Sequence, residues 1–394
     1  MRTLVLTKIY PHRASYYDDW LDAFSKPPFN ADSFNIMQMG AAKKLASVID
    51  DYELVVLLHA CTADALGNID ALSSVLQNRK NKLLVLVGNE GNSPDSPLGK
   101  KIAFLQKIDA DYIATYLLKE TAEWLYSDCR GKVIAMPHAL NPEAFKPEMA
   151  LAQRPIDLGT RTFRYLPYIG DRDRTRIMEY FEERNFNPPL KLDFSTSDRF
   201  DRTGWSAFLN SCRGTVSTEA GSHYMDKDDA LVIAIRQHVL KGRKGVTLSG
   251  QSAIWRLGSR LPYPVKAMIH KLMRRGPITH AAVADEKLDY DEIIEMFFKN
   301  AEKCPHYSKV LSSRHFDAIG TKTVQIMFPG RFNDIFKADE HYIALAPDFS
   351  NIDEVIEKFR DDSFVKNMTD KTYEFVMDAH TYAHRMDQLA SLLR

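Results

Sequence analysis

The sequence predicts an α/β protein with two domains, each built around a parallel sheet. Short apolar runs and helical stretches alternate through the first 145 residues, and the alternation starts again after residue 150. Such alternation is typical of parallel sheets covered by helices on both faces. Between the halves, the string PHALNPEAFKP starts at Pro137 and has three prolines in eleven residues, which favours a linker.

The first half contains six apolar runs of strand length. Stretches with helical character separate them at residues 18–24, 41–49 and 63–77. No G-x-G-x-x-G follows the first strand, so this half is a poor candidate for a dinucleotide-binding domain. The expected strands are residues 3–7, 33–37, 52–59, 83–87, 112–116 and 133–136.

The second half repeats the alternation and ends in a long helical segment. Ser312 or Ser313 can cap a helix that stops at Gly320, because a hydroxyl satisfies a free N–H group at a helix start. Arg314 and Asp317 lie in that helix, and a helix N-terminus at a sheet edge suits a phosphorylated ligand. The expected strands are residues 161–165, 190–194, 214–217, 324–328 and 341–346. The expected helices are residues 174–184, 204–210, 290–300, 313–320, 352–359 and 371–393.

Composition excludes several classes of protein. The chain has 394 residues, with 52 basic and 52 acidic side chains, so it lacks the basic balance of a nucleic-acid-binding protein. It has no apolar run of 18 residues and no secretory leader, so we expect a cytoplasmic protein without a membrane span. Four scattered cysteines without metal-site spacing favour reduced thiols.

Residues 236–283 form a basic insertion. Ten Lys or Arg lie between Arg236 and Arg275, and residues 230–284 contain no Asp or Glu. Aromatic and aliphatic residues interleave with the cations, as in segments that lie on anionic lipid. Two interpretations stay open: peripheral contact with the inner face of the membrane through 236–275, or a solvated insertion that forms a basic wall of the ligand cleft.

One ordered stretch resembles a known family. SRHFDAIGTKTVQIMFPGRFNDIFKADEHYIALAPDFSNIDEVI, from Ser313, is similar to the donor-site region of GT-B glycosyltransferases, in the group called glycosyltransferase family 1 or spore-maturation-protein-like. The linker resembles the P-x-G-V-D-x-x-x-F-x-P string of these enzymes. STEAGSHYMDKDD, from Ser217, resembles their E-x-G-x-S-x-x-D-x-D-G segment. The chain departs from the family at Lys309, where an acid is usual, and in the shorter turn before Gly320.

The resemblance implies two Rossmann-like domains that face each other across a cleft. The N-terminal domain, residues 1–145, would bind the acceptor, and residues 150–360 would bind a nucleotide sugar. Residues 361–394 would form a C-terminal helix that crosses back to the N-terminal domain. The implied activity is transfer of a sugar from a nucleotide-diphosphate sugar to an acceptor hydroxyl, in bacterial cell-surface glycan or glycoconjugate synthesis.

The donor residues follow from the matching motifs and from the loop after the first strand of the second domain. Arginines would stabilise the leaving diphosphate, Asp317 would bind the ribose, and Glu219 would act in catalysis and hold sugar hydroxyls. The alternative for Asp317 is an ion pair on a helix surface, and for the Glu219 segment an ordinary turn. The predicted donor residues are Arg161, Arg164, Arg174, Glu219, Gly221, Ser222, Ser313, Arg314, Asp317, Gly320 and Thr321.

The acceptor residues are expected where strands of the first domain end. Loops at the carboxyl ends of parallel strands face the cleft. His12 could act as general base near neutral pH, although it could also be a surface histidine. GNEGN, from Gly88, resembles a G-N-E-Y segment of the family. The predicted acceptor residues are Tyr10, His12, Arg13, Asn89, Glu90 and His138.

We expect no metal and no cofactor beyond the donor substrate. His380 and His384 lie four apart, but they match an H-x-Y-x-x-R pattern of the family's last helix. The acceptor could be a glycan, a glycolipid or a protein. Two other functions stay open: a binding or structural protein that keeps this fold without turnover, and a nucleotide-sugar epimerase of the same fold.

Overall fold

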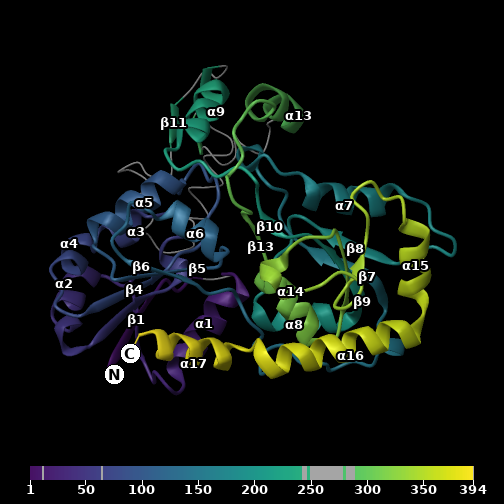
Figure 1. The fold of residues 1–394 in the computed structure, drawn as a ribbon, viewed down its shortest axis with the longest axis horizontal. Coiled ribbons are helices and arrows are strands. Elements are labelled where there is room, and N and C mark those ends of the chain that lie inside the picture. Colours follow the sequence, from purple (N-terminus) through teal and green to yellow (C-terminus); the bar gives the residue numbers. More distant parts are fainter. Residues whose placement is uncertain (11–12, 64, 242–245, 249–277, 281–288, 394) are drawn as a thin grey trace.

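The structure is a computed structural model that describes residues 1–10, 13–63, 65–241, 246–248, 278–280 and 289–393. Two α/β domains lie side by side, with the N-terminal domain in purple and blue and the C-terminal domain in teal to yellow (Figure 1). His12 and most of the basic insertion 236–283 lie outside the described residues.

The N-terminal domain contains a parallel sheet of six described strands in the order β2-β1-β3-β4-β5-β6. β1 pairs with β2 on one side and β3 on the other, so the strand order reverses between β1 and β3. The strands are β1 (Thr3–Thr7), β2 (Asp32–Asn35), β3 (Leu54–Leu57), β4 (Lys82–Leu86), β5 (Tyr112–Thr115) and β6 (Lys132–Ala135). The helices are α1 (Ser15–Ser25), α2 (Ala41–Ala46), α3 (Gly67–Asp70), α4 (Ser73–Gln77), α5 (Leu98–Lys107) and α6 (Lys119–Leu125).

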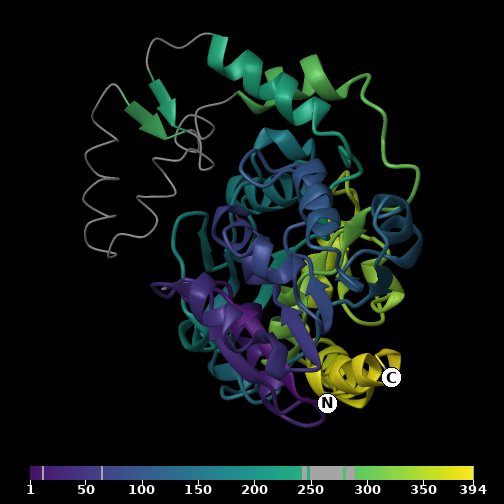
Figure 2. The ribbon, with the colours of Figure 1, turned by 90° about the vertical axis from the view of Figure 1, so that its left-hand side faces the viewer.

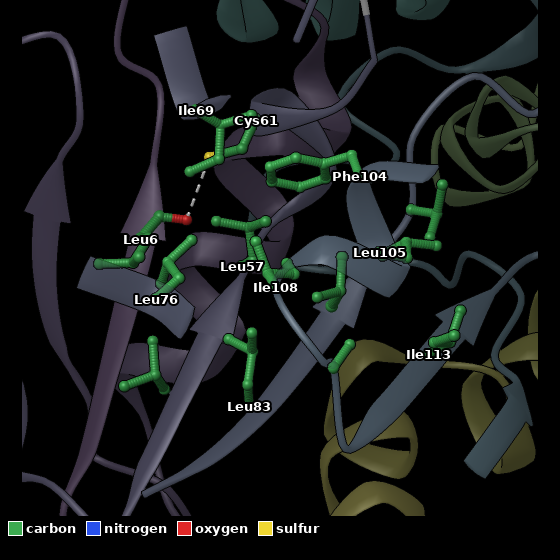
Figure 3. Packing of buried hydrophobic residues seen from close by; sticks show 14 of the residues in the cluster. Leu6, Leu57, Cys61, Ile69, Leu76, Leu83, Phe104, Leu105, Ile108 and Ile113 are labelled. Atoms are coloured by element: carbon green, nitrogen blue, oxygen red, sulfur yellow. Dashed lines mark hydrogen bonds between the residues drawn. The ribbon is translucent and has the colours of Figure 1, made fainter. Parts of the chain in front are cut away.

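Alternate residues of these strands bury two apolar layers, one on each face of the sheet. Leu6 and Leu57 pack with Phe104 on one face, where the Cys61 thiol also donates to the Leu6 carbonyl at 3.5 Å (Figure 3). Val5 and Val56 point to the opposite face. Burial on both faces explains why the strands are continuous apolar runs in the sequence.

The C-terminal domain contains a parallel sheet of five described strands in the order β15-β14-β9-β7-β8. Here the order reverses between β7 and β9. The strands are β7 (Ile156–Arg161), β8 (Leu192–Ser195), β9 (Cys212–Ser217), β14 (Val324–Met327) and β15 (Ile343–Ala344). The helices around them are α7 (Asp173–Glu183), α8 (Arg202–Ser211), α14 (Ser313–Gly320) and α15 (Ile352–Arg360).

A smaller unit lies beside the two sheets, at the top of Figure 1. It contains α9 (Ala230–Lys241), α13 (Tyr290–Ile293), a π-helical turn at 294–298 and the paired strands β11 (Val246–Leu248) and β12 (Ile278–His280). An antiparallel pair, β10 (Ala220–Gly221) with β13 (Lys309–Val310), connects this region to the C-terminal domain.

The C-terminal segment forms two helices instead of the single helix predicted at 371–393. α16 (Asp362–Ala379) packs on the C-terminal domain, and α17 (Tyr382–Leu392) packs on α1 of the N-terminal domain (Figure 2). The break lies at His380 and Thr381 because the linker intervenes: Leu140 N–H donates to the His380 carbonyl, and Tyr382 N–H donates to the Leu140 carbonyl. The chain therefore crosses back to the N-terminal domain at this break.

The first strand of the second domain also differs from its predicted position. It covers residues 156–161 instead of 161–165, because Leu158 fills the core while residues 162–166 leave the sheet as a partly exposed loop. Charged contacts join the two domains, including Arg202 with Asp19 at 2.9 Å and Arg331 with Glu120 at 2.8 Å. No helix in the described part of the chain is long and apolar enough to cross a membrane.

Candidate functional site

A polar cavity of about 380 Å³, including solvent at its mouth, lies at the carboxyl ends of the C-terminal strands. It lies where β7 meets β9, the point of reversal in strand order and the usual ligand position in open α/β sheets. None of its lining residues carries a carboxylate. The lining combines Arg161, Arg174 and Arg314 with Thr160, Thr162, Thr215, Ser217, Gln325 and the indole of Trp205, and with the apolar Met178, Leu209 and Val216.

Two of these arginines, Arg174 and Arg314, line the cavity, and the Asp317 carboxyl acts on Arg314 as a partial counter-charge. Arg314 donates from Nη1 to Thr162 Oγ1 at 2.6 Å, and Arg174 donates from Nη2 to the Tyr165 hydroxyl at 2.5 Å. Neither forms an ion pair with a carboxylate in the described residues. Burial and the neighbouring Arg174 lower the pKa of Arg314 to about 9. Two guanidinium groups close enough to affect each other favour an anionic ligand.

Two lining residues, Arg314 and Trp205, are positioned by the starts of two helices. Ser312 caps α14, and its own N–H donates to His315 Nδ1 at 3.1 Å, so Arg314 lies in the first turn. Asp201 caps α8 by accepting from Gly204 N–H at 2.8 Å, which places Trp205 in the first turn of that helix. The cap residue of α14 is therefore Ser312, and Ser313 is a buried residue of its first turn.

The other predicted arginines have different surroundings. Arg161 lines the cavity but also pairs with Asp193 at 2.8 Å and lies over the Phe208 ring at 4.1 Å. The side chain of Arg164 is 63% exposed, and its nearest carboxylate is Glu179 at 3.8 Å. The structure therefore brings Arg161, Arg174 and Arg314 together and leaves Arg164 at the surface.

Asp317 lies at the contact between the domains. Its Oδ2 accepts from Trp205 Nε1 at 2.9 Å and from the Ser15 hydroxyl of α1 at 3.3 Å. Burial, followed by repulsion from Asp19, raises the pKa of the Asp317 carboxyl well above its usual value. Trp205 lines the cavity and Asp317 does not, so Asp317 is placed to hold the indole of Trp205. Ribose binding by Asp317 stays a prediction.

Gly320 and Thr321 pack against the linker and the core. A Cβ on Gly320 would come within 2.6 Å of the Phe145 carbonyl and of the Leu140 side chain. The Thr321 hydroxyl is buried and donates to the Ala318 carbonyl at 3.1 Å. Neither residue lines the cavity. Close packing against Leu140 and Phe145 explains why a glycine occupies position 320.

The Glu219 segment forms a structured loop beside the cavity. Glu219 is buried, and its carboxylate accepts from Phe332 N–H at 2.6 Å and from the Tyr307 hydroxyl. Burial raises its pKa. Gly221 has a φ of +90°, which favours glycine, and its N–H donates to the Tyr165 hydroxyl at 3.1 Å. The Ser222 hydroxyl donates to the Ile169 carbonyl.

Lys309 takes part in a buried ion cluster where the family usually has an acid. Its Nζ lies 2.5 Å from Asp171 and 2.6 Å from Asp173. Burial raises the pKa of Asp171, and the Lys309 ammonium opposes that shift. The cluster fixes β13 to the start of α7 and so positions the loop that contains Tyr165.

The predicted acceptor residues that the structure describes, which do not include His12, lie at the carboxyl edge of the N-terminal sheet, but most are occupied by other contacts. Arg13 donates from Nε to Asp18 at 2.7 Å, and Tyr10 packs near Tyr17 and Ala60. Glu90 is buried, accepts from the Thr115 hydroxyl at 2.6 Å and from Tyr126, and has its pKa raised to about 7 by burial. Asn89 adopts a left-handed conformation with φ of 48°.

A histidine and aromatic cluster lies at the reversal point between β1 and β3. His138 is buried and its Nδ1 accepts from Trp20 Nε1 at 3.4 Å. The His59 ring lies 5.6 Å from that of His138, and its buried Nδ1 has no partner among the described residues. Burial lowers the pKa of both imidazoles, that of His138 to about 3. Tyr16 and Tyr116 complete the cluster.

Sequence reasoning missed His59, Tyr116, Tyr165 and Trp205. His59 ends the apolar run at 52–59, so the rule that ligands bind where parallel strands end would have selected it. Tyr165 ends the strand predicted at 161–165, so the same rule would have selected it, whereas Trp205 had no such signal because its contact with Asp317 is 112 positions away. His380 and His384 instead contact Arg385 and Thr381, and no group of three metal-binding side chains occurs in the described residues.

Comparison with known proteins identifies the fold and a family match in the C-terminal part of the chain. Residues 277–391 match the family described as glycosyl transferase-like. Sucrose-phosphate synthase from Thermosynechococcus elongatus is 11% identical, with a TM-score of 0.50 over 100% of this chain and 98% of that chain. HepE from Anabaena, solved in complex with UDP-glucose, is 10% identical, with a TM-score of 0.51 over 100% and 99%. No curated protein sequence shows significant similarity.

These similarities confirm the predicted fold of two Rossmann-like domains with a C-terminal crossover. The two solved structures are aligned over the whole length of the chain and establish the architecture. The family match covers the donor-side motif from Ser313 and most of the two C-terminal helices. The chain therefore has the fold of the GT-B glycosyltransferases, and its C-terminal part matches a glycosyl transferase-like family.

Proposed function

We propose that this protein is a glycosyltransferase that binds the diphosphate of a nucleotide sugar between Arg174 and Arg314 and transfers the sugar to an acceptor hydroxyl. The observation that carries the proposal is the pair of guanidinium groups that line a cavity without a carboxylate. A diphosphate supplies the missing negative charge. The match of residues 277–391 and the UDP-glucose bound to HepE support a nucleotide sugar as the donor.

The reaction follows from where charge develops. The bond between the sugar C1 and the diphosphate oxygen breaks, and its electron pair stays on the diphosphate. The acceptor hydroxyl oxygen forms the new bond to C1, and its proton passes to the departing diphosphate or to a base. Arg174 and Arg314 stabilise the charge that grows on the diphosphate, so their contribution is larger in the transition state than with bound substrate.

The acceptor would enter from the N-terminal domain. The carboxyl ends of its strands present Tyr16, His59, Tyr116 and His138, a mostly buried and uncharged surface. Aromatic faces and neutral imidazoles suit a carbohydrate better than a charged acceptor, which supports a glycan or glycolipid over an acidic protein segment. Peripheral membrane contact through residues 236–275 stays a hypothesis from composition, because those residues lie mostly outside the described part.

The test measures release of nucleoside diphosphate from a panel of nucleotide sugars with mixed glycan acceptors. We expect one donor to be consumed by the natural protein, and Arg314→Gln to lower kcat/KM by about 100-fold, since a hydrogen bond to a charged group contributes about 1.5–3 kcal/mol. Arg184→Gln is the matched control, because it removes one positive charge at the far end of α7, where Arg184 contacts Tyr180 and Asp353.

Two outcomes would contradict the proposal. Unchanged kcat/KM in Arg314→Gln would remove the cavity from the reaction. Binding of a nucleoside diphosphate without product for any donor and acceptor would favour the binding protein without turnover.

A further inference from the structure

Tyr165 lies in the loop that follows β7 and contacts Arg174, which lines the cavity. Its side chain is half-buried, so one part packs against the protein and another meets solvent. The guanidinium of Arg174 lies over its ring at 3.9 Å from the centroid. This stacking fixes the orientation of the ring and places the hydroxyl beside the cation that lines the cavity.

The hydroxyl of Tyr165 accepts two hydrogen bonds. Arg174 Nη2 donates to it at 2.5 Å, and Gly221 N–H donates at 3.1 Å from the other side. A tyrosine hydroxyl has limited acceptor capacity and one proton to donate. With two donors already bound to its oxygen, the remaining function is donation, and no acceptor for that proton occurs among the described residues.

The surroundings match a ligand oxygen that carries negative charge. Arg314 and Arg174 both lie near the hydroxyl. Burial is the main cause of the lowered pKa of Arg314, and Tyr165 partly offsets that lowering. The N-terminal domain approaches from the other side. Burial, followed by the Glu90 carboxylate, raises the pKa of Tyr116, and the Tyr165 hydroxyl adds to that shift. Tyr165 therefore lies where the two domains meet.

We propose that Tyr165 is a further substrate-binding residue, whose hydroxyl donates its proton in a hydrogen bond to an oxygen of the donor diphosphate. This inference rests on the proposed function. Arg174 orients the phenol and contacts the same diphosphate, and the Gly221 N–H prevents the hydroxyl from turning away. The Glu219–Ser222 loop therefore affects the substrate indirectly, because the backbone N–H of Gly221 positions the Tyr165 hydroxyl.

The experiment measures the affinity of inorganic pyrophosphate by calorimetry, because this probe does not depend on the nucleobase. Tyr165→Phe keeps the ring under Arg174 and removes only the hydroxyl. We expect its dissociation constant to rise about tenfold or more, as for the loss of a hydrogen bond to a charged oxygen. Tyr180→Phe is the matched control, since the Tyr180 hydroxyl also accepts from an arginine, Arg184 at 2.8 Å, on α7 away from the cavity.

A second variant separates donation to the ligand from a structural role. Site-specific replacement of Tyr165 by 3,5-difluorotyrosine gives a hydroxyl that loses its proton at lower pH than tyrosine does. We expect pyrophosphate affinity to decline at correspondingly lower pH, because the ionised oxygen cannot donate and repels the anion. If the hydroxyl lies away from the ligand and only accepts from Arg174 and Gly221, its ionisation neither removes a donor nor repels the anion, and the decline does not move.

The outcomes distinguish this inference from the proposed function. If the natural protein binds neither pyrophosphate nor any nucleoside diphosphate, the proposed function fails. If the natural protein binds pyrophosphate and Tyr165→Phe binds it equally well, the role of Tyr165 is overturned while the donor site stands. An unchanged pH profile for the difluorotyrosine variant also overturns it.

Discussion

The two domains use the same type of sheet but carry different side chains at its carboxyl edge. In the C-terminal domain, the reversal point between β7 and β9 opens into a cavity with Arg174 and Arg314 at its wall. In the N-terminal domain, the reversal point between β1 and β3 is filled by rings, with His59 and His138 held neutral by burial. Cations without an ion pair favour an anion, whereas neutral imidazoles favour hydroxyl groups, and this difference supports the proposal that the C-terminal domain binds the donor and the N-terminal domain the acceptor.

The largest expected effect comes from removing both cations of the cavity. Arg174→Gln combined with Arg314→Gln should weaken nucleoside diphosphate binding about 1,000-fold, because each change removes a charged hydrogen-bond donor. His59→Phe should leave that affinity within twofold. Calorimetry on the folded variants checks both values. A large loss in His59→Phe would show that the two edges share one ligand and would break the comparison.

The next effect is on stability at acid pH. The folded-state pKa of His138 is about 3, against 6.5 as the ordinary value. As the pH falls below about 6.5, His138 takes up a proton in the unfolded chain but not in the folded protein. The free energy of unfolding therefore falls until the pH reaches the folded-state pKa of about 3. At pH 5 the cost is roughly 2 kcal/mol, at 1.36 kcal/mol per pKa unit.

His138→Asn tests that cost, because the Asn side-chain oxygen can replace Nδ1 as the acceptor for Trp20. Denaturant unfolding at pH 7 and pH 5 should show a smaller loss of stability in this variant than in the natural chain, by roughly 2 kcal/mol. An equal loss in both proteins would mean that His138 accepts a proton in the folded state and that this edge is open to water.

The smallest effect is expected from Asp317→Asn. Asn keeps an oxygen that can accept from Trp205 and Ser15, so the contact between the domains persists. We expect nucleotide-sugar affinity to change by less than threefold. A loss of tenfold or more would restore the ribose role implied by the motif and would extend the donor site past Trp205.

The sequence predicted the fold better than the site. Alternation and the proline-rich linker were enough to predict two parallel sheets, because strands buried on both faces appear as continuous apolar runs. The cavity residues Arg161, Arg174 and Arg314 were predicted because they follow strand or helix boundaries. Asp317 and Gly320 lie in the same matching motif, but their helix faces the N-terminal domain and the linker, and a motif does not specify which face meets the ligand.

Other features depend on contacts that local sequence does not encode. The break between α16 and α17 arises because Leu140 of the linker bonds to both sides of Thr381. The role of Tyr165 requires Gly221, which is 56 positions away. Lys309, at a position where an acid is usual, is explained by Asp171 and Asp173, which come from the loop after β7 and the start of α7.

The most direct test of the central claim is a crystal structure with a bound nucleoside diphosphate. We predict phosphate oxygens within about 3 Å of the guanidinium groups of Arg174 and Arg314, at the reversal point between β7 and β9. A diphosphate bound at the other reversal point, beside His59 and His138 of the N-terminal domain, would contradict it.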